Sequence, residues 1–178
     1  MLLIDTHRTD TDIEPFKSVY ETFSKLGVAV PVPLKLMSAS APLFKGYVAF
    51  LAHYKDHMDL RVKLRTAIRY HVASVSRFEA CVEFNENALT MLGMSSNIEG
   101  LAAKMPVSSL PEEEQRILSF VSDALFRPRL IDRRRVEQMK KTGISEQTLF
   151  DAVVHGGLLL MMGPLVAAFS DEAHINEK

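Results

Sequence analysis

Apolar and polar residues alternate along 59–92 with the spacing of two helices folded into an antiparallel hairpin. In the first helix, which Asp59 is expected to cap, apolar residues return every three or four positions and so share one face. That face consists of Leu60, Leu64, Ala67, Ile68, Val72 and Val75. The pattern predicts that this face is buried.

The second helix of the hairpin is predicted to begin at Arg77, because Ser76-Arg77-Phe78-Glu79 has the form of a capping box. Gly93 is expected to end it. Its inward stripe consists of Phe78, Cys81, Val82, Asn85, Ala88, Leu89 and Leu92. A buried amide such as that of Asn85 needs a hydrogen-bond partner.

The hairpin also groups the candidate catalytic residues. If the chain reverses near 75–76, His71 lies level with Cys81, and Thr66 lies level with Asn85. A Cys–His pair at hydrogen-bond distance would lower the pKa of the thiol and make it nucleophilic. The alternative is that Cys81, a lone cysteine on an apolar stripe, is an inert small hydrophobe.

The flanking segments read as further helices separated by short connectors. Proline and acidic residues at their starts and glycine after their ends set the boundaries. The predicted helices are 12–27, 34–38, 41–58, 96–105, 111–125, 132–141 and 146–169, with an extended link at 28–33 where two prolines alternate. The sequence therefore predicts one all-α domain of six to eight helices around the hairpin, with tails at 1–10 and 171–178.

The last predicted helix is apolar nearly all round, and 156–169 contains no charged residue. That run of 14 residues is shorter than the roughly 20 needed to span a bilayer, so we expect a core or subunit-contact helix and no membrane span. Gly163-Pro164 is expected to kink or break it. Asp151 and His155 are four residues apart and could form an orienting carboxylate–imidazole pair, or an ordinary surface ion pair.

Composition narrows the function classes. The 178 residues are 47% hydrophobic and carry a net charge of −1, so no global field favours nucleic acid or an anionic membrane. A single cysteine excludes an internal disulfide and suits a reducing, cytoplasmic environment. The N-terminus lacks the basic flank and long apolar core of a secretion signal. His53 and His57 have metal-binding spacing, but two ligands do not close a site, so no metal or other cofactor is predicted.

Five arginines gather in one part of the chain: Arg127, Arg129, Arg133, Arg134 and Arg135. The phosphates of a nucleic acid bind favourably to such a basic patch, so a nucleic-acid-binding regulator is one interpretation. Acidic residues lie among the arginines and no aromatic residue does. A solvated face or a subunit salt-bridge surface is therefore favoured, and no nucleic-acid partner is expected.

The stretch LRTAIRYHVASVSRFEACVEFNENALTMLGMS resembles the core of the alkylhydroperoxidase AhpD-like and carboxymuconolactone decarboxylase-like families. In that pattern a Glu stands twelve residues before a C-x-x-C pair, a His follows the second Cys by four residues, and the helix ends in L-G-M/D-S. The segments LKLMSASAPLF, LPEEEQRILSF and ISEQTLFDAVV fit the flanks. The resemblance covers 14–169 and implies a helical domain that assembles into dimers, trimers or hexamers.

Most of the family's active-site residues are missing from this sequence. The family's Glu falls on Thr66, its first Cys on Phe78, its second Cys on Cys81 and its His on Asn85. Phe78 cannot resolve a sulfenic acid, and neither Thr66 nor Asn85 titrates. The internal two-thiol peroxidase cycle implied by the family is therefore excluded by composition.

Two main functions follow as expectations. The first is a divergent member of this group that acts as a non-peroxidatic homo-oligomer and keeps a pocket for a small apolar ligand, lined by Phe78, Asp151 and His155. The second is a one-cysteine antioxidant enzyme that uses Cys81, with His71 as base and Asn85 as polar orienter, and an external thiol. A decarboxylase role rests on the resemblance alone.

Overall fold

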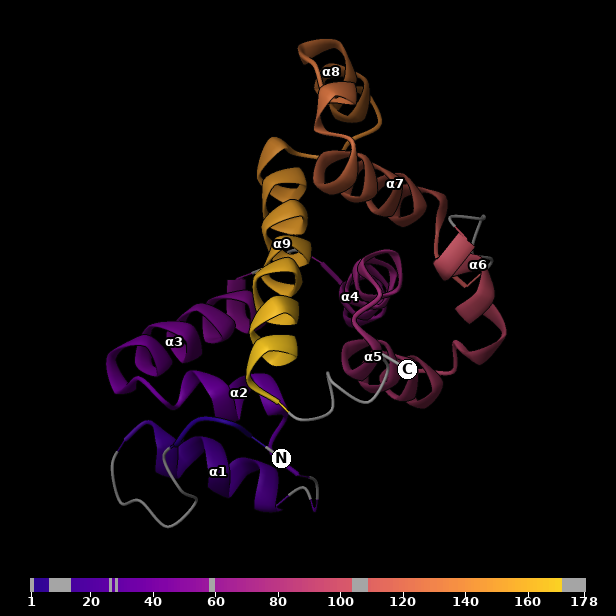
Figure 1. The fold of residues 1–178 in the computed structure, drawn as a ribbon. Coiled ribbons are helices and arrows are strands. Elements are labelled where there is room, and N and C mark those ends of the chain that lie inside the picture. The colour runs from indigo at the N-terminus through magenta and orange to yellow at the C-terminus, as the bar shows by residue number, and fades with distance from the viewer. Residues whose placement is uncertain are drawn as a thin grey trace. The chain divides into compact units, whose positions relative to one another are not determined.

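The structure is a computed structural model that describes residues 2–6, 14–25, 27, 29–57, 60–103 and 109–170. This part of the chain contains nine α-helices and two short 3-10 helices (Figure 1). In order they are α1 (Phe16–Lys25), α2 (Val32–Met37), α3 (Ala41–His57), α4 (Val62–Ser76), α5 (Glu79–Met91), η1 (Ser95–Asn97), α6 (Ile98–Ala103), α7 (Glu112–Phe126), η2 (Pro128–Leu130), α8 (Arg133–Lys141) and α9 (Glu146–Phe169). The predicted all-α fold is confirmed, and each of the nine α-helices in this part of the chain overlaps one of the predicted helical ranges, although the expected number was six to eight.

The chain separates into two compact units, which are described one at a time. The first combines Met1–His57 with Pro164–Lys178, and the second is Met58–Gly163. The single domain expected from the sequence stays a prediction. The predicted Asp59 cap and the tail at 171–178 lie outside the described residues.

In the first unit, two aromatic rings form the centre of the packing. Phe16 of α1 and Phe44 of α3 are fully buried, and their ring centroids are 4.4 Å apart. Leu2 forms an antiparallel bridge with Ser170, and the Leu3 amide donates to the Phe169 carbonyl at 2.9 Å. The start of the predicted N-terminal tail is thereby bonded to the end of α9.

The second unit is built on the predicted hairpin. Helices α4 and α5 pack against each other, and α6 and α7 pack against α4. One continuous core joins Leu64 and Ile68 of α4 to Leu89 of α5, Val121 of α7 and Leu159 of α9. The apolar stripes predicted for the hairpin are therefore buried at most positions, although Val75 is 37% exposed.

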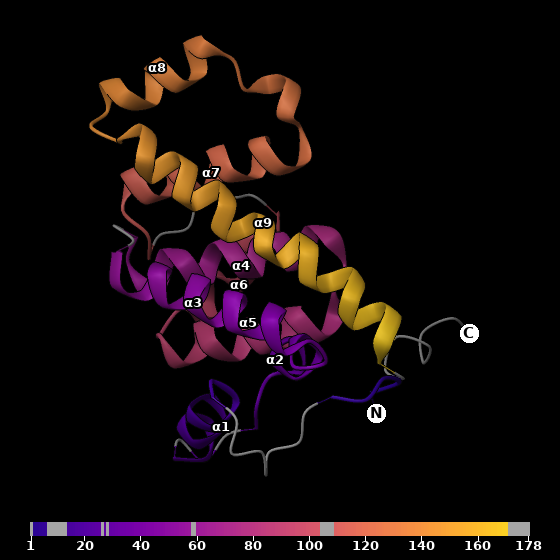
Figure 2. The ribbon, with the colours of Figure 1, turned by 90° about the vertical axis from the view of Figure 1, so that its left-hand side faces the viewer.

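Helix α9 crosses close to α4 and α7, as Figure 2 shows. A Cβ atom added at Gly156 would lie 2.9 Å from a methyl of Leu125, 3.1 Å from one of Val121 and 3.2 Å from one of Ile68. Only a residue without a side chain allows this approach. By length and composition α9 could cross a membrane, as the core helix of a soluble protein also could, and 39% of its apolar window is buried.

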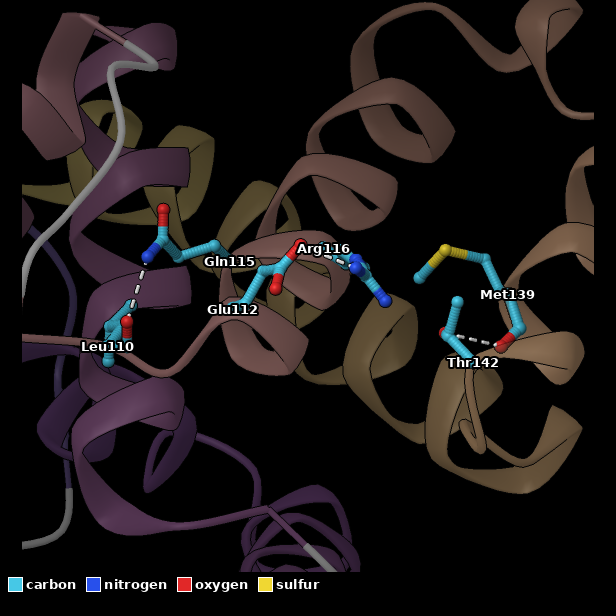
Figure 3. A network of polar contacts seen from close by, with 6 residues as sticks. All are labelled: Leu110, Glu112, Gln115, Arg116, Met139 and Thr142. Carbon is cyan, nitrogen blue, oxygen red and sulfur yellow. Dashed lines mark hydrogen bonds and ion pairs between the residues drawn. The ribbon is translucent and has the colours of Figure 1, made fainter.

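Several helix ends form as the sequence predicts. The Asp132 carboxylate accepts from the Arg135 amide at 2.7 Å and caps α8, and the Ser145 hydroxyl accepts from the Thr148 amide at 2.9 Å and caps α9. Figure 3 shows side-chain bonds near the ends of α7 and α8, where the Gln115 amide donates to the Leu110 carbonyl at 2.8 Å and the Thr142 hydroxyl to that of Met139. The same figure shows the Arg116–Glu112 ion pair.

One prediction based on proline is wrong, and of the kink or break predicted at Gly163-Pro164 the break does not occur. The extended link was expected to reach Pro33, but α2 begins at Val32, because proline is tolerated in the first turn of a helix. Helix α9 is not broken at Gly163-Pro164 and continues to Phe169 with Pro164 inside it. The packing of a long apolar helix can outweigh the loss of one backbone hydrogen bond.

Candidate functional site

The turn of the hairpin determines where Cys81 lies. Helix α4 continues to Ser76, and Arg77 adopts a left-handed conformation with φ of 57°. The Phe78 amide then donates to the Ala73 carbonyl at 3.0 Å, and the Arg77 amide to that of Ser74 at 3.3 Å. This is a Schellman ending of α4, so the predicted capping box at Ser76 does not form and α5 starts at Glu79.

Cys81 lies in the first turn of α5 and is buried, with 7% of its surface exposed. Burial raises the pKa of the thiol above its ordinary value of 9.0, because the thiolate would lose its hydration, while the nearby Arg69 charge opposes this effect. The sulfur is therefore a protonated thiol at neutral pH. A nucleophilic cysteine needs the opposite balance.

The two polar residues predicted beside Cys81 bond within their own helices. The Asn85 side-chain amide donates to the Cys81 carbonyl at 2.6 Å and is almost fully buried. The Thr66 hydroxyl donates to the Val62 carbonyl at 2.9 Å. Each side chain thus satisfies its polar group one helical turn away, as Ser, Thr and Asn commonly do inside helices.

His71 is fully buried but does not pair with Cys81. Its Nδ1 lies 2.7 Å from the Leu101 carbonyl oxygen, and its Nε2 lies 2.8 Å from the Ser122 hydroxyl. A carbonyl only accepts, so in the neutral ring Nδ1 carries the proton and Nε2 accepts from Ser122. The expected Cys81–His71 pair is therefore absent, because both nitrogens bond to α6 and α7.

The expected pair of Asp151 and His155 also does not form as an ion pair. His155 is buried, and its Nε2 lies 3.3 Å from the Arg65 carbonyl oxygen, to which it can donate. Burial, and then the positive charges of Arg69 and Arg65, lower the pKa of His155 from 6.5 to about 4. The imidazole is therefore neutral at physiological pH, and the alternative of a surface ion pair is wrong for the same reason.

Arg69 is the residue that the sequence analysis missed. Its charge lowers the pKa of Cys81 on α5 and also that of His155 on α9, so it lies within electrostatic range of both. Three helices thereby bring one arginine, one thiol and one neutral imidazole into the same region. We call these three residues the Arg69 group. The available signal was that Arg69 directly follows Ala67 and Ile68, two buried residues of α4.

Phe78 lies at the edge of this region and fills space against α9. A Cβ atom added at Gly163 would be 2.2–2.4 Å from three carbons of the Phe78 ring. The ring therefore rests directly on the Gly163 backbone. Phe78, which the sequence predicted as a pocket residue, is packed against a helix on at least this side.

Metal ligands do not cluster in the part of the chain that the structure describes. No three or more His, Cys, Asp or Glu side chains are grouped there so that they could hold an ion. His53 on α3 is exposed, and the side chain of His57 is not among those described.

Several solved structures share this fold, and two of them are described here. The chain matches an uncharacterized peroxidase-related protein from Silicibacter sp. TM1040 with a TM-score of 0.76 and 19% identity, covering 98% of this chain and 94% of that one. It matches an uncharacterized peroxidase-related protein from Ralstonia eutropha JMP134, described as an alkylhydroperoxidase AhpD core, with a TM-score of 0.76 and 14% identity, covering 96% and 93%. No protein-family model and no curated protein sequence matches the chain.

These matches define the fold as that of AhpD-like peroxidase-related proteins. At 14–19% identity they carry no reaction over to this chain. What the chain does must be argued from its own residues.

Proposed function

We propose that this AhpD-fold chain does not catalyse peroxide reduction by the two-thiol cycle, and that it acts as a homo-oligomer that binds a small, largely apolar molecule. The observation that carries the first part is the burial of Cys81, which raises the pKa of its thiol above the ordinary value. A peroxidatic cysteine must be a thiolate at neutral pH, and it needs a second thiol to resolve the sulfenic acid.

The neighbouring positions support the same conclusion. Phe78 stands where the resemblance would place the family's first cysteine, the partner thiol of Cys81, and its ring packs on Gly163. Thr66 and Asn85 stand where it would place the Glu and the His, and both bond to carbonyls of their own helices. Each of these side chains has a local structural role, and none can transfer a proton at neutral pH.

The ligand is proposed to lie beside the Arg69 group. Cys81 belongs to the buried core to which α4, α5 and α9 contribute apolar side chains, and the guanidinium of Arg69 would face a polar or anionic end of the molecule. The probe 8-anilinonaphthalene-1-sulfonate has both features and fluoresces when bound. We expect saturable binding near one probe per chain, weakened in Arg69→Gln and unchanged in the surface control Lys63→Gln, an exposed position of α4. Absence of saturable binding, or equal binding by both variants, contradicts this placement.

The peroxidase question has its own test. Turnover of cumene hydroperoxide with dithiothreitol should stay at the background rate both in the wild type and in Cys81→Ser. Turnover by the wild type that is lost in Cys81→Ser would establish the alternative, a one-cysteine enzyme with an external thiol. One observation favours that alternative: the charge of Arg69 lowers the pKa of Cys81 against the effect of burial.

A further inference from the structure

Helix α5 carries an exposed apolar stripe with an acidic edge. Phe84 is 49% exposed and Met91 is 89% exposed, and at 100° per residue both lie within about 40° of Ala80 on the helix surface. Glu79 and Glu83 border this stripe on one side. We call these five residues the acidic stripe. Residues 79–91 contain three acidic and no basic residues, so the helix has a formal charge of −3.

The exposure of the acidic stripe requires an explanation. Isolated surface hydrophobes are ordinary, but an aromatic ring and a methionine aligned on one helical face are typical of interfaces. A nearly fully exposed methionine adds nothing to the stability of the folded monomer. Its burial against a partner would be favourable by roughly 25 cal/mol per Å² of apolar surface.

A second surface of the same unit has the opposite charge. Residues 127–141 contain seven basic and two acidic residues, a formal charge of +5. Arg129, Arg133 and Arg134 are exposed around Leu130, which is 53% exposed. We call these four residues the basic face. In the described part of the chain, Arg129 and Arg134 make no hydrogen bond or ion pair.

Two arginines of the basic face also interact unfavourably with the dipole of their own helix. Arg133 and Arg134 stand in the first turn of α8, where the macrodipole favours acidic residues. Helix stability therefore does not account for their presence. The charge of Arg133 acts on Glu146 of the same chain, whereas that of Arg134 is available for a partner with carboxylates.

Within the unit Met58–Gly163, the two surfaces lie far apart. Figures 1 and 2 both show α8 at one end of this unit and α5 toward the other, with α7 and α4 between them. One copy of the unit cannot bring the two surfaces together. Two copies can, if the acidic stripe of one meets the basic face of the next.

We infer that copies of this chain associate head to tail, with the acidic stripe of α5 on one copy bound to the basic face of η2 and α8 on its neighbour. Arginine binds carboxylates through paired hydrogen bonds and stacks on aromatic rings, so Arg129 and Arg134 suit both Glu83 and Phe84. Because such a contact joins two different surfaces, it closes into a ring or extends as a filament. The inference rests on the proposed homo-oligomer and not on its ligand.

The test is the mass of the assembly, measured by sedimentation equilibrium at about 0.1 M salt. We expect the wild type to be larger than a monomer. Glu83→Arg and Arg134→Glu should each weaken association about tenfold or more, because each places like charges together. The double variant Glu83→Arg with Arg134→Glu restores opposite charges across the contact and should recover most of the association.

Matched controls are Glu113→Arg and Lys63→Glu, which change the charge equally on exposed positions of α7 and α4 outside both surfaces. Circular dichroism checks that every variant keeps its helix content.

If the wild type is oligomeric but the charge reversals do not change its association, or the double variant does not recover, the head-to-tail contact is wrong and the oligomer stands. If the wild type is monomeric at every concentration, both are wrong. If Arg134→Glu alone acts, the basic face serves a different acidic partner, and the inference is also wrong.

Discussion

The two sides of α4 differ in how their polar groups are held. On the side of α6 and α7, His71 bonds to the Leu101 carbonyl and the Ser122 hydroxyl at 2.7 and 2.8 Å. On the side of α5 and α9, the charge of Arg69 acts on a buried thiol and a buried imidazole. The first side is a closed network of short bonds, and the second holds groups whose ionisation is shifted by burial and charge.

This difference distinguishes residues that hold the fold together from residues that are candidates for a function. A buried histidine with two short hydrogen bonds fixes the packing of the three helices that it joins. Ionisation shifted by burial and by a neighbouring charge is a more typical feature of binding or reactive sites. The Arg69 group is therefore the part of the chain in which a ligand should be sought, and His71 belongs to the scaffold.

The largest expected effect is on the closed side. His71→Leu should lower the free energy of unfolding by about 3 kcal/mol, because the buried Leu101 carbonyl and Ser122 hydroxyl both lose their partner. Urea unfolding followed by circular dichroism measures this. Ser122→Ala, which removes one of the two bonds, should cost about 1 kcal/mol. A loss below about 1 kcal/mol in His71→Leu would show that the network does not hold the helices together.

The second prediction concerns pH on the other side. The folded state keeps the pKa of His155 at about 4, whereas the unfolded chain has the ordinary value of 6.5. Between these values the unfolded state binds more protons, so stability is complete above pH 6.5 and falls as the pH is lowered toward 4, by up to about 3 kcal/mol. Urea midpoints across this window measure the loss. In His155→Gln the loss should be smaller by most of that amount, and an unchanged slope would contradict the assignment.

The third prediction compares two adjacent glycines where α9 meets its neighbours. Gly156→Ala should destabilise the protein by about 1–3 kcal/mol, because its Cβ would lie 2.9 Å from the Leu125 side chain. Gly157→Ala is the matched control, since its Cβ would lie 3.7 Å from that side chain, and it should be neutral or stabilising by up to about 1 kcal/mol. Thermal unfolding distinguishes them. Equal effects would mean that α9 does not pack this closely.

The smallest effect tests the Arg69 group itself. Because the charge of Arg69 lowers the pKa of His155 and that of Cys81, Arg69→Gln should raise both. An NMR titration of the His155 ring proton shows the first change, with Lys63→Gln as a control for general charge. If both pKa values stay where they are, Arg69 does not lie close to these residues.

The sequence predicted the fold well because helix signals are local. The caps at Asp132 and Ser145 form as expected, and the apolar stripes of the hairpin mark its buried faces. The hairpin turn was misplaced because the left-handed position is held by Arg77, where the usual signal is glycine. No capping-box pattern can reveal such an exception.

The candidate site was harder to predict because periodicity identifies a face and not the neighbour that the face meets. His71 was expected to lie level with Cys81 of α5, but its side chain bonds to α6 and α7. Its hydrogen-bond partners are 30 and 51 residues away in sequence. Arg69 was missed because charged residues on amphipathic helices usually face solvent.

The state of Cys81 is the centre of this account, and its alkylation rate measures that state most directly. Native protein would be treated with iodoacetamide from about pH 6 to 10, with the modified fraction followed by mass spectrometry. The account predicts slow modification whose rate rises only near or above 9.0, the ordinary pKa of the thiol. Rapid modification at neutral pH, with an apparent pKa well below that value, would contradict it.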